Sequence, residues 1–350
     1  MAICIPSCTS TEHDICIALC LACKAAKQEK RPVEEDASHA EYRTDTSSSG
    51  NRPSGNSPAG DIPRTSSRQG LLNGLLAVVI FSGSMPGTRV AVLGFTPLLL
   101  TSLRALIAGA LAALMLARFR QPAPDARQWR QLAVVALCCV IGFPLISALA
   151  LQHMSAARSL VFMGLLPLST ATFGVIRAGE RPSPAFWLFA LTGAAAVAGF
   201  ALTKNAESSL LGDALMILSI IVCGLGYAEG AIVTRSLGGW QVISWALVMC
   251  IPLALAGVIA FWPAQGLGPV PLQSWIGLGY VSVFSMLIGF IFWYRGLSLG
   301  GIASVSQLQL LQPFMGLGLA ALLLHEQVGP AMLGVMALVV GSVAGAKRFA

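Results

Sequence analysis

Two charged side chains stand within long apolar runs of this 350-residue chain and could take part in chemistry there. They are Arg104 and Glu229. A charge inside a bilayer costs about 2.5–3.5 kcal/mol on insertion scales, so it usually faces water or an opposite charge. Glu229 could bind a proton or a cationic solute, or it could pair with an arginine near the end of its helix. Arg104 could attract an anionic solute, or it could hold helices together by donating to backbone carbonyls.

Other polar residues extend this set of candidate substrate-binding residues. Arg158 lies at the start of an apolar run, either as an interfacial side chain or as part of a binding site. Ser306, Gln309 and Pro313 follow an i, i+3, i+7 spacing and so share one helix face. Hydroxyl and amide groups of this kind, including Ser84 near the start of the apolar region, could replace the water around a solute. The alternative is a hydrogen bond between helices, worth about 0.6 kcal/mol.

Small residues repeat along another apolar run and have a simpler interpretation. Ser282, Ser285 and Gly289 form a stripe that is typical of close packing between helices. Prolines within apolar runs remove a backbone hydrogen bond and kink a helix. Pro167 and Pro313 are therefore candidate hinges.

The sequence lacks the motifs of common enzyme classes. It contains no H-E-x-x-H, no G-x-S-x-G and no paired aspartates within apolar runs. Cys16, Cys20 and Cys23 have a spacing known from iron–sulfur enzymes, but bilayer helices follow them instead of a soluble barrel. An intramembrane enzyme is thus a weaker alternative, and we expect no cofactor and no metal.

The composition places most of the chain in a membrane. Hydrophobic residues make up 55% and charged residues only 11%, against about 25% in soluble domains, and the mean hydropathy is +0.75. The basic residues punctuate apolar runs instead of forming a patch, which argues against nucleic-acid binding. Apolar segments near the length of a spanning helix predict an all-α integral membrane protein with ten transmembrane helices, at 71–90, 96–117, 130–151, 156–177, 185–203, 211–234, 241–262, 274–294, 301–324 and 328–346.

An internal repeat organises these ten segments. At a constant offset of 146 residues, Trp129 matches Trp275, Pro167 matches Pro313, Glu180 matches Glu326, and Gly199 matches Gly345. A weaker match joins Gly70 to Gly212. We therefore predict two five-helix repeats, 71–203 and 211–346. Because five is odd, the second repeat must enter the membrane from the opposite side, as in the inverted repeats of secondary transporters.

With these features the sequence resembles the EamA-like transporters of the drug/metabolite transporter superfamily. The resemblance covers residues 71–350 and rests on the two repeats, on Arg104 after Pro97, and on two helix ends, Gly179-Glu180-Arg181-Pro182 after Pro167 and His325-Glu326 after Pro313. It implies a permease or exporter of small metabolites. It also implies a cavity among the first, third, fourth, sixth, eighth and ninth helices. It does not identify the substrate.

Charge placement predicts the orientation and sets the N-terminal segment apart. Of the 37 charged residues, 17 lie among residues 1–70. We expect residues 1–69 to be a disordered cytoplasmic tail, in part the product of a start codon placed too early. With the N-terminus inside, nearly all Lys and Arg flanking the spans fall on the cytoplasmic side, so both termini are expected there.

The sequence thus predicts a multi-pass protein of the inner or plasma membrane that moves a small molecule, such as an amino acid or a related compound, by alternating access. Proton coupling and assembly into a homodimer are left open. A polar-lined channel is the alternative that the sequence excludes least. The expected partners are the substrate and the lipid bilayer, with no nucleic acid.

Overall fold

The computed structural model describes residues 64–178, 183–202, 209–300, 305–325 and 328–347. All regular elements within these ranges are helices, and Arg68–Ala350 forms one compact unit. The expected tail at residues 1–69 falls, up to residue 63, outside the described residues, as do Glu180 and Glu326.

The first half of the unit runs from α2 to α9. Its elements are α2 (Arg64–Ser82), α3 (Ser84–Ala91), α4 (Pro97–Arg118), α5 (Ala126–Val135), the π-helical η1 (Ala136–Gly142), α6 (Phe143–Ala150), α7 (Ala156–Met163), α8 (Leu166–Phe173), the π-helical η2 (Gly174–Ala178) and α9 (Pro184–Leu202). Local signals set several of these boundaries. The Thr96 hydroxyl accepts a hydrogen bond from the Leu99 amide with Pro97 at the first helical position, and Asp125 forms a capping box with Gln128.

The second half repeats this order. It contains α10 (Leu210–Leu237), α11 (Gly239–Phe261), α12 (Leu272–Gly279), the π-helical η3 (Tyr280–Ile288), α13 (Gly289–Gly300), the 3₁₀-helical η4 (Gln307–Leu310), α15 (Leu311–Leu324) and α16 (Pro330–Lys347).

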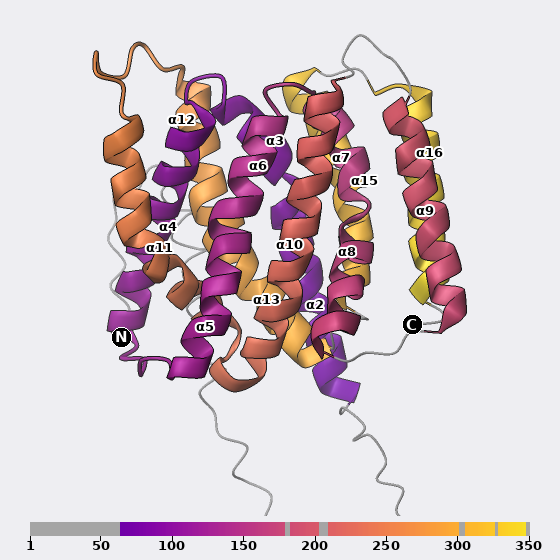
Figure 1. The fold of residues 1–350 in the computed structure, drawn as a ribbon, viewed down its shortest axis with the longest axis horizontal. Coiled ribbons are helices and arrows are strands. Elements are labelled where there is room, and N and C mark those ends of the chain that lie inside the picture. The colour runs from indigo at the N-terminus through magenta and orange to yellow at the C-terminus, as the bar shows by residue number, and fades with distance from the viewer. Residues whose placement is uncertain (1–63, 179–182, 203–208, 301–304, 326–327, 348–350) are drawn as a thin grey trace, which may run out of the picture. The chain divides into compact units, whose positions relative to one another are not determined.

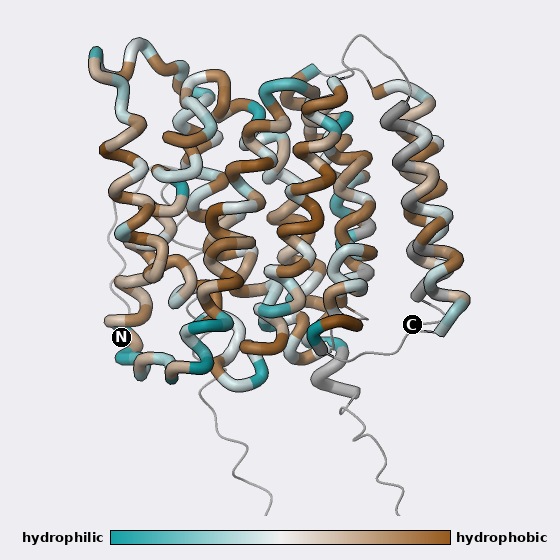
Figure 2. The backbone as a smooth tube through the Cα atoms, viewed as in Figure 1, coloured by the Kyte–Doolittle hydropathy of each residue, from teal (hydrophilic) through white to brown (hydrophobic). Residues whose placement is uncertain are grey.

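Seven helical stretches of the described residues are long and apolar enough to cross a membrane. They are Arg68–Ala91, Pro97–Arg118, Ala126–Ala150, Ala156–Arg177, Leu210–Leu237, Gly239–Phe261 and Leu272–Gly300. Leu311–Leu324 and Pro330–Ser342 are shorter apolar helices. Figure 2 shows hydrophobic residues along the length of the helices and hydrophilic residues gathered near the connections. The all-helical membrane architecture is confirmed.

Two pairs of helices with the same rank in the two halves pack closely against each other. The second helix of the first half, α4, packs on its counterpart α11, and the fifth, α9, packs on α16. Figure 1 shows α9 beside α16 at one edge of the bundle. The contacts therefore follow the internal repeat.

The helix that carries each candidate hinge proline is interrupted close to it. α7 ends at Met163 and α8 resumes at Leu166, directly before Pro167. In the other half the 3₁₀ turn η4 precedes Pro313. A ring in place of the amide hydrogen favours such a change of helix geometry nearby.

Candidate functional site

A buried polar group of three side chains links α4, α3 and η3. Arg104 lies two turns into α4 with its side chain 4% exposed, and one guanidinium nitrogen donates to the Ser285 hydroxyl at 3.1 Å. The Ser285 and Ser84 hydroxyls are 2.7 Å apart. The structure thus joins two sequence candidates, Arg104 and Ser84. Our expectation that Ser285 only permits close packing is wrong, because this residue bridges them.

The π-helical segments η1 and η3 occupy the same place in the two repeats. Ser285, which bonds to Arg104 and Ser84, belongs to η3. Cys139 in η1 and Ser285 in η3 are 146 residues apart. Each meets the first helix of the other half: Ser285 contacts Ser84, and Cys139 lies so close to Gly226 that a Cβ there would be 2.4 Å from its sulfur. Ser84 and Gly226 are 142 residues apart, the offset that relates Gly70 to Gly212. The structure therefore supports that weaker match.

Arg158 lies in the bundle core and forms an ion pair with an acid that sequence reasoning missed. Its Nε and Nη2 donate to the two carboxylate oxygens of Asp213 at 2.9 and 2.7 Å. Both residues are buried, with Arg158 1% exposed, so Arg158 faces the inside of the bundle, while its place at the membrane interface or in a binding site stays a prediction. The apolar runs also predict Glu229 as the only acid inside a span, and this prediction is wrong. Asp213, in the first turn of α10, is a second, and its sequence signal was an acid directly after the joint that begins this helix.

Glu229 pairs with Arg177 near the opposite end of α10. Two guanidinium nitrogens of Arg177 lie 2.9 Å from the same oxygen, Oε2. The Glu229 side chain is fully buried, whereas that of Arg177 is 48% exposed. The other oxygen, Oε1, has no hydrogen-bond partner within the described part of the chain. Of the two interpretations of Glu229, the arginine pair is the one observed, and a role in proton coupling stays a prediction.

The ninth-helix candidates are buried but do not bond to the Arg104 group. Gln309 is 2% exposed, and neither atom of its amide has a partner among the described residues. Ser306 is 1% exposed, and Pro313 is buried in α15. Gln309 belongs to the 3₁₀ turn η4, so the regular helical spacing assumed for these residues does not hold there.

An aromatic cluster joins α2, α10 and α13. The Tyr227 ring lies 5.7 Å from that of Phe290 and 5.5 Å from that of Trp293, and Phe81 packs edge-on against Phe290 at 5.2 Å. Tyr227 is the member of this cluster that lies within electrostatic range of Arg104.

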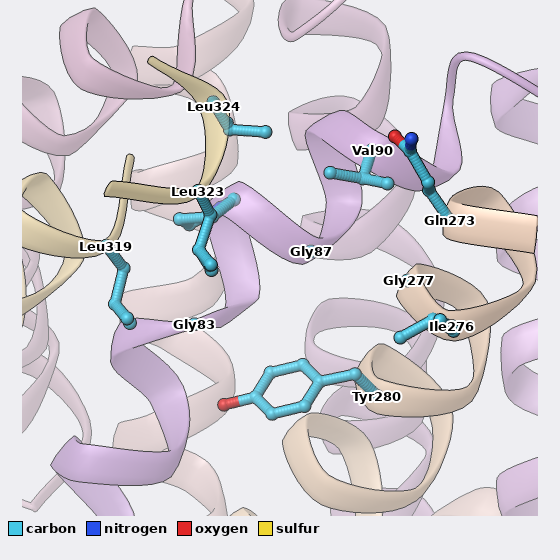
Figure 3. A pocket seen from close by; sticks show the side chains of 11 residues that line it. Gly83, Gly87, Val90, Gln273, Ile276, Gly277, Tyr280, Leu319, Leu323 and Leu324 are labelled. Atoms are coloured by element: carbon cyan, nitrogen blue, oxygen red, sulfur yellow. The ribbon is translucent and has the colours of Figure 1, made fainter. Parts of the chain in front are cut away.

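An open pocket lies where α3, α12 and α15 meet (Figure 3). Its volume is about 460 Å³, and its lining is mainly apolar: Gly83, Pro86, Gly87, Val90, Gln273, Ile276, Gly277, Tyr280, Leu319, Leu323 and Leu324. The Tyr280 hydroxyl donates to the Ile80 carbonyl at 2.6 Å, which holds its ring at the pocket wall. Within the described residues no group of His, Cys, Asp or Glu could hold a metal ion.

Comparisons with known proteins identify the family. The model of the EamA-like transporter family matches twice, at residues 68–202 and 210–346. The chain belongs to the EamA-like transporter family. It is 57% identical over 281 residues to the uncharacterized transporter YdeK of Bacillus subtilis (strain 168), a match that covers 80% of this chain and 98% of that protein. A crystal structure with 22% sequence identity superposes with a TM-score of 0.59, covering 80% of this chain and 96% of that one, and supports the fold.

The two copies of this EamA-like transporter meet at two equivalent contacts that differ in charge. Arg177 corresponds to Leu323 at the offset of 146, and Glu229 corresponds to Gly87 at the offset of 142. The Arg177–Glu229 ion pair between the copies therefore has its counterpart in Leu323 and Gly87, which line the pocket. The bundle is held together by charge at the first contact and is hollow at the second.

Proposed function

We propose that this protein is a secondary active transporter that moves a small metabolite by alternating access. The observation that carries the proposal is the unequal state of two equivalent places: the pocket at Gly87 and Leu323 is open, and the place of Glu229 and Arg177 is closed by an ion pair. Alternating access needs two such gates that open in turn on opposite sides of a site between the repeats. The sequence carries no ATP-binding motif, so a gradient is the proposed source of energy.

The proposed membrane arrangement has ten spanning helices and two copies inserted in opposite directions, with both termini in the cytoplasm. The packing of α4 on α11 and of α9 on α16 supports it, because two copies related by an axis in the membrane plane bring such counterparts together. In this arrangement the pocket faces the outer side, and the Arg177–Glu229 pair closes the cytoplasmic side. Pro167 and Pro313 are the proposed hinges.

Transport by the purified full chain in proteoliposomes tests this function. A growth screen of an overexpressing strain against toxic amino acids, analogues and other metabolites supplies the solute, because an exporter confers resistance to its own substrate. We expect uptake that saturates and that substrate on the opposite side accelerates. Conductance that does not saturate would instead indicate a channel.

Proton coupling is a separate part of the proposal and is assigned to Glu229. Its Oε1 is buried and has no donor among the residues that the structure describes, so it is the oxygen available to a proton. We expect Glu229→Gln to abolish accumulation driven by a proton gradient while exchange continues. Unchanged accumulation would assign the coupling to another group.

A further inference from the structure

The buried charges of the bundle do not balance. Four charged side chains are buried in the described part of the chain: Arg104, Arg158, Asp213 and Glu229. Arg158 neutralises Asp213, and the half-exposed Arg177 neutralises Glu229. Arg104 forms no ion pair with any acidic side chain in the ranges that the structure describes. Within the described part of the chain, one buried positive charge therefore remains without a counter-charge.

The immediate surroundings of Arg104 contain polar groups that also lack partners. Its guanidinium makes a hydrogen bond to Ser285, while the buried Nε has no acceptor among the described residues. Thr101, one helical turn earlier on α4 and so on the same face, has a buried hydroxyl that is equally unpartnered. Buried polar groups are normally satisfied, so several unsatisfied groups at one place indicate a missing partner.

We propose that the missing partner is the carboxylate of the transported solute, which Arg104 binds together with Thr101, Ser84 and Ser285. This inference deepens the proposed transport function and rests on it. A guanidinium presents its N–H groups in a planar fork that fits a carboxylate, and hydroxyl groups donate to the same oxygens. The solute is a monoanion, because the single unpaired arginine among the described buried residues neutralises one carboxylate.

The charges of the bundle argue against the other classes of solute. Both buried acids, Asp213 and Glu229, are engaged by arginines, so neither offers a free carboxylate to an ammonium group. A phosphate dianion is normally held by more than one cation or by clustered amides. Arg104 is here the single unpaired buried cation of the described residues.

The pocket provides a route to this site. Gly83 and Tyr280 line its wall, and the next residue after Gly83 is Ser84. A chain of hydrogen bonds therefore leads from the residue next to Gly83 to Arg104, from Ser84 through Ser285. When the Ser84–Ser285 bond opens, the two hydroxyls become free to bind the arriving carboxylate.

Matched pairs of solutes test the proposal on the purified full chain in detergent and in proteoliposomes. The probes are benzoate with benzamide, phenylacetate with phenylacetamide, and hexanoate with hexanamide, together with benzylamine and phenyl phosphate, all at equal ionic strength. We expect at least one carboxylate to raise the melting temperature of the wild type and to stimulate counterflow, while its amide does neither. If no carboxylate exceeds its amide, or if benzylamine or phenyl phosphate gives the larger effect, the proposal is overturned.

Three variants assign the effect to the proposed residues. Arg104→Gln should weaken carboxylate binding by roughly tenfold or more. Arg104→Lys should restore part of the affinity, because lysine keeps the positive charge but lacks the planar fork of N–H groups. Thr101→Val should raise KM with little change in kcat. Arg118→Gln, at the exposed end of the same helix, is the control and should leave binding unchanged.

The outcomes separate this inference from the transport function. If Arg104→Gln does not fold, Thr101→Val and Arg104→Lys still decide, and wild-type carboxylate affinity in both variants overturns the assignment. Saturable counterflow of a neutral or cationic solute that is equal in Arg104→Gln and the wild type would retain the transporter and reject the carboxylate site. Conductance without saturation would remove the transport function itself.

Discussion

Two equivalent helix contacts differ in what holds them together. The first joins α7, α8 and η2 to α10, and the second joins η4 and α15 to α2 and α3. The first has an ion pair near each end, Arg158–Asp213 and Arg177–Glu229. At the equivalent positions the second contact has Leu71 in place of Asp213, Leu323 in place of Arg177 and Gly87 in place of Glu229, none of which carries a charge. The same helix arrangement therefore supports one contact that contains ion pairs and one that contains none at the equivalent positions.

The burial of the two ion pairs ranks them further. Both members of Arg158–Asp213 are buried and joined by two parallel hydrogen bonds, which makes separation costly. In Arg177–Glu229 the arginine already reaches water, so this pair can open at a lower cost. We infer that Arg158–Asp213 keeps α7 and α10 together through the transport cycle. In the proposed transport cycle Arg177–Glu229 would be the pair that breaks, and the gap between α3 and α15 would close in turn.

Removal of one charge from the buried pair should have the largest effect on stability. Asp213→Asn removes the carboxylate that neutralises the buried Arg158, so we expect the free energy of unfolding to fall by about 3–5 kcal/mol. Unfolding of the purified protein in detergent measures this change. Asp125→Asn is the control, because Asp125 is exposed and asparagine is an equally good N-cap.

The double variant Arg158→Met with Asp213→Leu sharpens this prediction. With both charges replaced by apolar groups, most of the lost stability should return. A decrease below about 1 kcal/mol for Asp213→Asn would show that the pair does not hold these helices.

The half-exposed pair should give an intermediate effect. Arg177→Gln leaves a buried carboxylate with a weaker partner, and we expect a loss of about 1.5–3 kcal/mol. Glu229→Gln in the same chain should restore much of it, since the unpaired charge is then gone. Arg235→Gln, an exposed basic residue at the end of α10, is the control.

Arg177→Gln also tests whether the Arg177–Glu229 pair is a gate. If it closes the cytoplasmic side, Arg177→Gln should increase maleimide labelling of Cys139 and Cys223, which are buried when the pair is intact. Peptide mass spectrometry distinguishes these cysteines from the others. Labelling equal to that of Arg235→Gln would show that the pair is structural only.

The helical membrane architecture was predictable from the sequence, because residues that end or connect helices mark its boundaries. Polar and Pro/Gly-rich joints bound the apolar runs, and the family match at 68–202 and 210–346 agrees with a two-copy organisation. Arg104 and Glu229 were recognisable because a charge in an apolar run is rare. Asp213 was not, because an acid in the first turn of a helix looks like an ordinary interfacial residue.

The partners of the site residues depend on how the helices pack, which local sequence does not determine. Arg158 and Asp213 are 55 residues apart and meet only because α7 lies against α10. The π turns gave no clear signal either: Pro144 follows η1 closely, but no proline stands in or beside η3. For that reason Ser285 was taken for a packing residue although it faces Arg104.

The smallest effect on stability is expected where the contact is hollow. Leu323→Trp places a larger ring in an open pocket of about 460 Å³, so the free energy of unfolding should change by no more than about 0.5 kcal/mol. A glutamate at Gly87 would copy the ion pair more closely. It is the poorer test, because a Cβ there would lie 3.2 Å from Val281 and 3.3 Å from Tyr280.

Transport is where Leu323→Trp should act. A filled pocket can neither admit solute nor let α15 approach α3, so the initial rate in proteoliposomes should fall several-fold although the fold is intact. Leu322→Trp is the matched control, because Leu322 is 75% exposed and does not line the pocket. If both variants transport at the wild-type rate, the open pocket lies off the path. The hollow contact would then reflect loose packing between the copies at this place and not the gate that pairs with Arg177–Glu229.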